Sequence, residues 1–78
     1  MSTVTVRRDL LGLPRGDLLR RRDGTWSRVV DAQAALAALP DDASIGLFVD
    51  AYEAFRLAHR EHCQVETALA LDRARAPA

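Results

Sequence analysis

Residues 17–30 read DLLRRRDGTWSRVV, and they decide the fold class because they hold the strongest local signal in the chain. The Asp23-Gly24 pair near their centre readily adopts the positive φ angles that a two-residue hairpin turn requires. We therefore predict a β-hairpin over these residues. The cross-strand pairs would be Arg22 with Thr25, Arg21 with Trp26, Arg20 with Ser27 and Leu18 with Val29.

The residues before the hairpin favour extended or irregular structure. The stretch from Thr3 to Val6 alternates polar and apolar side chains that are all β-branched, which predicts a short strand. Gly12 and Pro14 interrupt the stretch that follows and indicate a turn or loop over Arg8 to Arg15. We therefore expect a small antiparallel sheet of two or three strands between about residues 3 and 30.

Helical signals dominate the rest of the chain. Asp31 can cap a short alanine-rich helix over residues 31–39, and Pro40 ends it. The chain then runs for about 30 residues with one early glycine and no proline, which predicts a long helix over residues 44–74, about 45 Å in length. The predicted fold class is therefore α+β, in a single domain of residues 1–78.

The predicted long helix is amphipathic, with apolar side chains in one broad sector of the helical wheel and polar ones opposite. The sheet and the short helix can cover its first half, but little sequence remains to cover residues 59–71. We therefore predict that a protein partner covers this half, and an antiparallel helix from a second copy, in a homodimer, is the simplest source. The predicted interface consists of Phe48, Tyr52, Phe55, His59, His62, Val65 and Leu69.

Four polar residues lie within or beside the apolar sector: His59, His62, Cys63 and Glu66. Imidazole, thiolate and carboxylate groups spaced three and four residues apart on one helix face are suitable metal ligands, and two copies could complete a site. Two other interpretations stay open. The histidines could form hydrogen bonds within an interface, or they could make that interface sensitive to pH. A nucleophilic role for Cys63 is disfavoured because a long helix offers no oxyanion hole.

The arginines of the predicted hairpin form a second candidate site. These residues, with the neighbouring indole, are Arg20, Arg21, Arg22, Trp26 and Arg28. An arginine-bearing β-ribbon can enter a DNA groove, and an exposed tryptophan can stack on a base. The same arginines could instead contact an acidic protein surface, or could serve only to keep an edge strand from aggregating.

Charge and cysteine content limit the classes of function. Eleven arginines balance eleven acidic residues, but residues 1–30 carry a net charge of +4 and residues 31–78 a net charge of −4. The single cysteine, Cys63, excludes an internal disulfide, and the first residues lack an apolar run of signal-peptide length, so we expect a cytoplasmic protein. No stretch approaches the roughly 20 apolar residues that span a bilayer, so no membrane association is expected.

These patterns predict a noncatalytic interaction or accessory protein, without a cofactor, that self-associates or binds a larger protein through the apolar face of its C-terminal helix. The first alternative is a small nucleic-acid-binding protein or regulator that uses the arginine-rich hairpin. The second alternative is a helical dimer that binds a metal ion.

Overall fold

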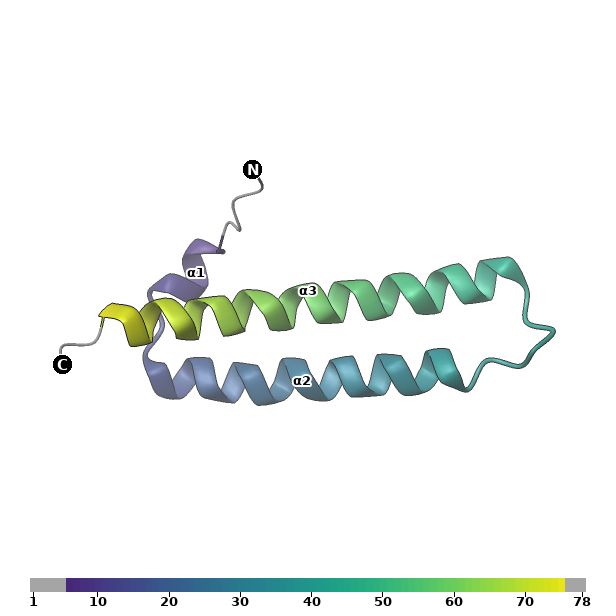
Figure 1. The fold of residues 1–78 in the computed structure, drawn as a ribbon, viewed down its shortest axis with the longest axis horizontal. Coiled ribbons are helices and arrows are strands. Elements are labelled where there is room, and N and C mark those ends of the chain that lie inside the picture. Colours follow the sequence, from purple (N-terminus) through teal and green to yellow (C-terminus); the bar gives the residue numbers. More distant parts are fainter. Residues whose placement is uncertain (1–5, 76–78) are drawn as a thin grey trace.

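The protein is described by a computed structural model that covers residues 6–75. Three helices follow one another along the chain: α1 (Arg8–Leu11), α2 (Arg15–Ala37) and α3 (Ile45–Arg75). The helices α2 and α3 lie side by side in antiparallel directions, and the short α1 packs near the end of α3 where the chain finishes (Figure 1). No strand occurs between residues 6 and 75, so the predicted α+β class is wrong and the described chain is all-helical.

The predicted β-hairpin is replaced by the first half of α2. This helix runs through Asp23 and Gly24 without a break, and no glycine in the described residues has a positive φ angle. The local turn signal is overridden because the buried positions Leu18, Thr25 and Val29 are spaced by seven and four residues, as a helix face requires. Packing that face against α3 outweighs the cost of a mid-helix glycine, which is only about 0.5–1 kcal/mol.

The other predicted elements agree with the structure to different extents. Residues 3–5 of the predicted strand lie outside the described residues, and part of the predicted loop is the helix α1. The predicted short helix at residues 31–39 is the last part of α2, which ends at Ala37 shortly before Pro40. The long helix begins and ends within one residue of the predicted range of 44–74, and the Ser44 hydroxyl caps it by accepting a hydrogen bond of 3.2 Å from the Leu47 amide.

The two long helices meet along a seam in which inward-facing positions alternate in spacings of four and three residues. On α2 they are Leu18, Arg22, Thr25, Val29, Ala32 and Leu36, and on α3 they are Ala51, Phe55, Ala58, His62, Val65, Leu69 and Asp72. This spacing is the heptad pattern of an antiparallel coiled coil. Two pairs fix the register, since Arg15 Nε donates to Asp72 Oδ2 at 2.9 Å and Thr25 Oγ1 lies 3.0 Å from His62 Nδ1.

The helices α2 and α3 together form a helical hairpin, and the hydrophobic core occupies only one end of it. Its buried members are Leu10, Leu18, Val65, Ala68 and Leu69, with Val6 and Leu13 packed against them. At this end Leu10 of α1 covers the seam from a third side, and the Arg7 amide donates to Gln64 Oε1 at 3.1 Å. We call residues 6–29 and 56–75 the α1 end, and residues 30–55 the loop end.

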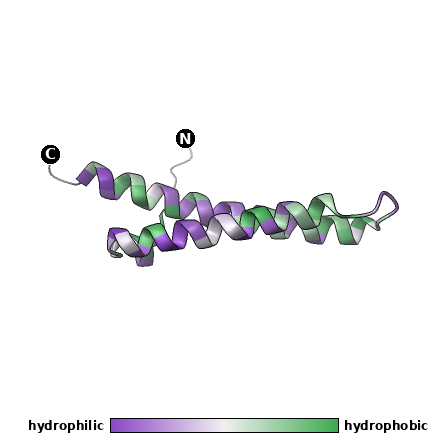
Figure 2. Ribbon diagram, turned by 90° about the horizontal axis from the view of Figure 1, so that it is seen from below, coloured by the Kyte–Doolittle hydropathy of each residue, from purple (hydrophilic) through white to green (hydrophobic). Residues whose placement is uncertain are grey.

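The loop end has no comparable cover. None of residues 30–55 is buried, although the part of both helices next to the connecting loop is rich in hydrophobic residues (Figure 2). The seam there is lined by small or half-buried side chains, because two helices alone leave both sides of the line between them open to water. The fold therefore has a complete core at one end and an incomplete one at the other.

Candidate functional site

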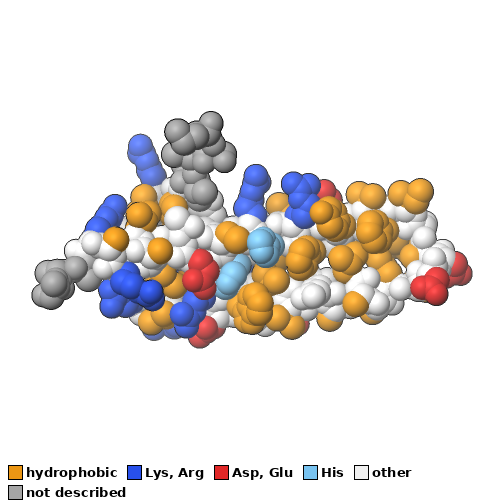
Figure 3. All heavy atoms as spheres, viewed as in Figure 1, with side chains coloured by type: hydrophobic (Ala, Val, Ile, Leu, Met, Phe, Trp, Pro, Cys, Tyr) orange, Lys and Arg blue, Asp and Glu red, His pale blue; other side chains and the backbone are white. Residues whose placement is uncertain are grey.

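Large apolar side chains are exposed along one side of the hairpin. The indole of Trp26, the phenyl ring of Phe48 and the phenol of Tyr52 are 54%, 53% and 46% exposed, respectively. Phe55 is half-buried beside them, and His59 is exposed one turn further along α3. Figure 3 shows hydrophobic side chains gathered over both helices towards the connecting loop, with the imidazole rings at the border of the charged half. We call Trp26, Phe48, Tyr52, Phe55 and His59 the aromatic face.

Ring contacts order the aromatic face. Phe48 stacks on Tyr52 with ring centroids 6.3 Å apart, and Phe55 stacks on His59 at 6.0 Å. Both pairs join residues four positions apart on α3, so each ring limits the rotamers of its neighbour. Aromatic pairs at such distances contribute about 0.5–1.5 kcal/mol each beyond the burial of their area. The face is thus partly organised before anything binds to it.

Two residues of the predicted interface are buried in the core of the chain. Val65 and Leu69 are 3% and 7% exposed and belong to the core that α1 and α2 cover. The sequence predicts that residues 59–71 lack cover, but the structure leaves the preceding half of α3 without a buried residue instead. The reason is that residues 17–30 form a helix, which lies against the second half of α3, and not a hairpin.

His62 connects the aromatic face to the seam. Its Nδ1 lies 3.0 Å from the buried hydroxyl of Thr25, which also donates to the Arg22 carbonyl oxygen at 3.1 Å. Its Nε2 lies 3.5 Å from the Glu66 carboxylate, and its ring packs against Trp26 with centroids 5.3 Å apart. Only 15% of the His62 side chain is exposed. Its nitrogens therefore have partners within the chain, which favours a structural role.

The four candidate metal ligands do not converge in one chain. Cys63 Sγ lies 3.7 Å from His59 Nδ1, and His62 faces Glu66 as described above. The four residues thus form two separate pairs. In the described part of the chain, no three His, Cys, Asp or Glu side chains are placed so that they could hold a metal ion together. A metal site that needs two copies stays a prediction without support from the single chain.

The arginines of the predicted hairpin are distributed around α2. Arg20 pairs with Asp17, and Arg22 lies 3.6 Å from the Asp23 carboxylate. Arg21 and Trp26, which the predicted register placed opposite each other, instead line different hollows of the surface. The groups therefore do not form the arginine ribbon on which the nucleic-acid hypothesis depended.

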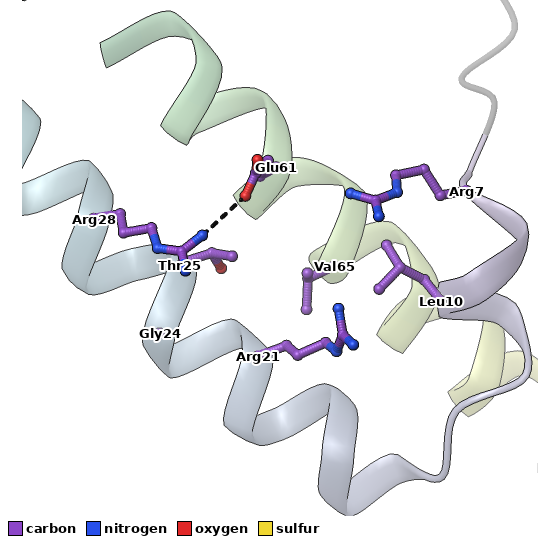
Figure 4. A pocket seen from close by; sticks show the side chains of 8 residues that line it. All are labelled: Arg7, Leu10, Arg21, Gly24, Thr25, Arg28, Glu61 and Val65. Atoms are coloured by element: carbon purple, nitrogen blue, oxygen red, sulfur yellow. Dashed lines mark hydrogen bonds and ion pairs between the residues drawn. The ribbon is translucent and has the colours of Figure 1, made fainter. Parts of the chain in front are cut away.

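A cationic hollow of about 270 Å³ lies between α1, α2 and α3, beside the core (Figure 4). Leu10 and Val65 line it together with three arginines, and Arg28 Nη1 donates to Glu61 Oε2 at 3.2 Å across its rim. A second of these arginines, Arg7, pairs with Asp9 at 2.8 Å. Carboxylates within the chain thus already bind two of its three guanidinium groups.

Charge is separated along the hairpin. The loop end holds five acidic residues and no arginine, which gives a net charge of −5. The α1 end holds eleven arginines and six acidic residues, which gives a net charge of +5. The sequence showed opposite charges in its front and back halves, but folding redistributes them between the two ends because α2 and α3 both span the full length. The acidic residues of the loop end are Asp31, Asp41, Asp42, Asp50 and Glu53.

None of the helices between residues 6 and 75 carries an apolar stretch long enough to cross a bilayer. The chain matches no protein-family model, and no curated protein and no solved structure is similar enough to it to count as a match. Its function therefore has to be inferred from the side chains themselves.

Proposed function

We propose that this chain is a noncatalytic interaction protein whose aromatic face docks on the helices of a protein partner. The observation that carries the proposal is the contrast between the two ends. The α1 end buries its apolar seam under a third element, whereas the loop end exposes Phe48 and Tyr52 beside a seam in which no residue is buried, and Trp26 extends this exposed surface into the α1 end.

The energetics favour a helical occupant for this face. Full burial of an exposed large apolar side chain contributes about 1.5–3 kcal/mol, so burial of the remaining half of Trp26, Phe48 and Tyr52 contributes about half of that for each. Tyrosine and tryptophan are also the residue types that most often dominate binding energies at protein interfaces. The open side of a two-helix seam has the shape that one or two further helices fill in a bundle.

The alternative functions receive less support. Nucleic-acid binding by an arginine-bearing β-ribbon requires a β-hairpin at residues 17–30, and these residues form part of the helix α2. Cys63 and His59 are neighbours on an exposed face of α3, and the side of a helix does not by itself offer the hydrogen-bond donors of an oxyanion hole. We propose a cytoplasmic location on the ground that a single cysteine leaves the chain without an internal disulfide.

Photochemical crosslinking from the aromatic face tests the proposal in the cells that express the chain. Tyr52 is replaced by the photoreactive p-benzoylphenylalanine, and the matched control carries the same group in place of Leu57. Leu57 is 57% exposed on the same helix and lines a hollow with Arg7 and Glu61. It also borders a hollow with Tyr52, but five positions along α3 place its side chain about 140° around the helix from Tyr52.

A discrete adduct from position 52, absent from position 57, is the expected result. Equal labelling from both positions would contradict the proposal, because it would show contact without preference for the face. Absence of any adduct at position 52, with circular dichroism showing an intact helical fold, would contradict it as well.

A further inference from the structure

We infer that the partner of the aromatic face is a second copy of this chain, packed antiparallel to the first about a two-fold axis near Phe55. The inference rests on the proposed function and adds the identity and the direction of the partner. It is carried by the charge separation between the two ends, together with the position of the aromatic face along the hairpin.

Charge complementarity selects the antiparallel direction. Two hairpins side by side in opposite directions bring the loop end of each, with a net charge of −5, towards the α1 end of the other, with a net charge of +5. The parallel arrangement would bring Asp41 and Asp42 of both copies together at the same end. Like charges placed against each other across an interface disfavour an arrangement, and opposite charges favour it.

The α1 end has a cationic surface on the side of the aromatic face. Arg15, Arg22 and Arg73 line a hollow there together with Leu19, and the only acidic group in its lining is Glu66. Arg22 and Glu66 also line the neighbouring hollow that holds Trp26, so this cationic surface continues the aromatic face. Arg15 pairs with Asp72 and Arg22 lies beside Asp23, whereas none of the ion pairs between residues 6 and 75 involves Arg73. The acidic loop of a second copy would therefore find the Arg73 guanidinium beside the apolar contact.

The position of the two-fold axis follows from where the aromatic and imidazole rings lie along α3. The aromatic face and His62 span residues 48–62 of α3, and Phe55 lies midway, seven positions from Phe48 and seven from His62. An axis at Phe55 therefore lays the aromatic stretch of one copy along that of the other, with Phe48 facing His62. The same axis places Ile45, the first residue of α3, level with Val65 of the other copy, and the loop before Ile45, which carries Asp41 and Asp42, lies further towards the end of the other α3 that holds Arg73.

At the α1 end, the short helix α1 occupies the side of the seam opposite the aromatic face, which leaves only the side of the aromatic face open there. Leu10 of α1 and Arg7, which precedes this helix, line a hollow there with Arg21, Arg28 and Glu61 (Figure 4). A stable dimer buries about 800 Å² per partner, which is about one eighth of the 6092 Å² surface of this chain. Four antiparallel helices around one seam would give each loop end the cover that α1 gives the other end.

The first experiment measures self-association of the purified chain by sedimentation equilibrium, with circular dichroism as the check on folding. The expected species is a dimer of the 8.6 kDa chain. Tyr52→Ala should weaken the dimer about 30-fold or more, as loss of an interface hot spot does, whereas the control Leu57→Ala should change its Kd by less than about threefold.

A chain that stays monomeric at millimolar concentration would overturn the inference, as would equal effects of the two substitutions. The crosslinking experiment distinguishes failure of this inference from failure of the proposed function. A monomeric chain that still labels a different protein from position 52 would overturn only the inference, whereas a monomer that labels nothing would overturn both.

The second experiment tests the direction by charge reversal. The acidic variant carries Arg22→Glu and Arg73→Glu, and the basic variant carries Asp41→Arg and Asp42→Arg. Each variant alone should dimerise at least about tenfold more weakly than the native chain, and an equimolar mixture of the two should form a heterodimer that restores much of the affinity.

The matched control is Arg75→Glu, which reverses a charge two residues from Arg73 and therefore on a different side of α3. It should leave the Kd within about threefold of the native value. Failure of the mixture to recover affinity would overturn the antiparallel arrangement, and so would a gain in affinity by the basic variant alone.

Discussion

Gly24 lies in the middle of α2 with room for a larger side chain. A Cβ atom built on it would meet no other atom within 4 Å, and its φ angle is not positive. Gly24→Ala should therefore raise the free energy of unfolding by about 0.5–1 kcal/mol, because alanine loses less backbone entropy in a helix. Chemical denaturation followed by circular dichroism measures the change.

The sign of this effect distinguishes the helix from the hairpin that residues 17–30 suggest locally. In a tight hairpin turn, Gly24 would need a positive φ angle, and alanine would destabilise the fold. A measured loss of stability would therefore argue against the continuous helix α2. Gly16→Ala, in the first turn of the same helix, is a suitable comparison because only one distant arginine nitrogen approaches it.

The polar pair Thr25 and His62 shows what single residues contribute to register. Both occupy seam positions, and their nitrogen and oxygen atoms lie 3.0 Å apart. A shift of one helix along the other would leave a buried hydroxyl or imidazole without its partner, at a cost of about 1–3 kcal/mol. The pair therefore favours one alignment of α2 against α3, as polar residues in coiled-coil seams do.

At the scale of elements, α1 is short, but it supplies a buried side chain that completes the hydrophobic core. Leu10 is 2% exposed, whereas its neighbour Leu11 is 37% exposed. Leu10→Ala should lower the free energy of unfolding by about 2–4 kcal/mol, because it removes the side chain that covers the seam from a third side. Leu11→Ala should cost less than about 1 kcal/mol, since that side chain is already in contact with water.

Denaturant titrations of the two variants measure this difference. Equal costs would show that α1 does not provide the third side of the core. A further check is hydrogen exchange, in which Leu10→Ala should speed exchange of the α3 amides near Val65 and Leu69 more than those of the loop end.

The elements also show which features the sequence could predict. The helix α3 is predictable because about 30 residues without proline, capped by Ser44, leave few alternatives. The helix α2 is not, because Asp23-Gly24 is a stronger local turn signal than the spacing of Leu18, Thr25 and Val29 is a helical one. Only the contact with α3 resolves the conflict, and that contact is not local in sequence.

How well the sequence predicts the candidate site depends on the same conflict between the turn signal at Asp23-Gly24 and the helical spacing of α2. Apolar spacing along α3 correctly identifies Phe48, Tyr52 and Phe55 as one face of a helix. Which half of that face is covered, however, depends on whether residues 17–30 form a helix. Because they do, Val65 and Leu69 are buried in the core and not at the predicted interface. Trp26 joins the face for the same reason, since a helical α2 places its indole beside His62.

At the scale of the whole molecule, the separation of charge makes association sensitive to salt in a way that reports its direction. The net charges of −5 and +5 attract in an antiparallel dimer, and mobile ions screen exposed charges over about 10 Å at 0.1 M ionic strength and about 3 Å at 1 M. Raising sodium chloride from about 0.05 M to about 0.5 M should therefore increase the Kd of the dimer several-fold.

The opposite response would identify a parallel dimer, because salt would then relieve the repulsion between the two acidic loops. Sedimentation equilibrium at four or five salt concentrations gives the slope of log Kd against log salt. A variant with Asp41→Asn and Asp42→Asn serves as the control, since it removes two charges from the loop end but none from the aromatic face. Its Kd should depend less steeply on salt than that of the native chain, while Tyr52→Ala should weaken the dimer at every salt concentration without changing the slope. Charge would then set the direction of association, and the aromatic rings would supply most of its affinity.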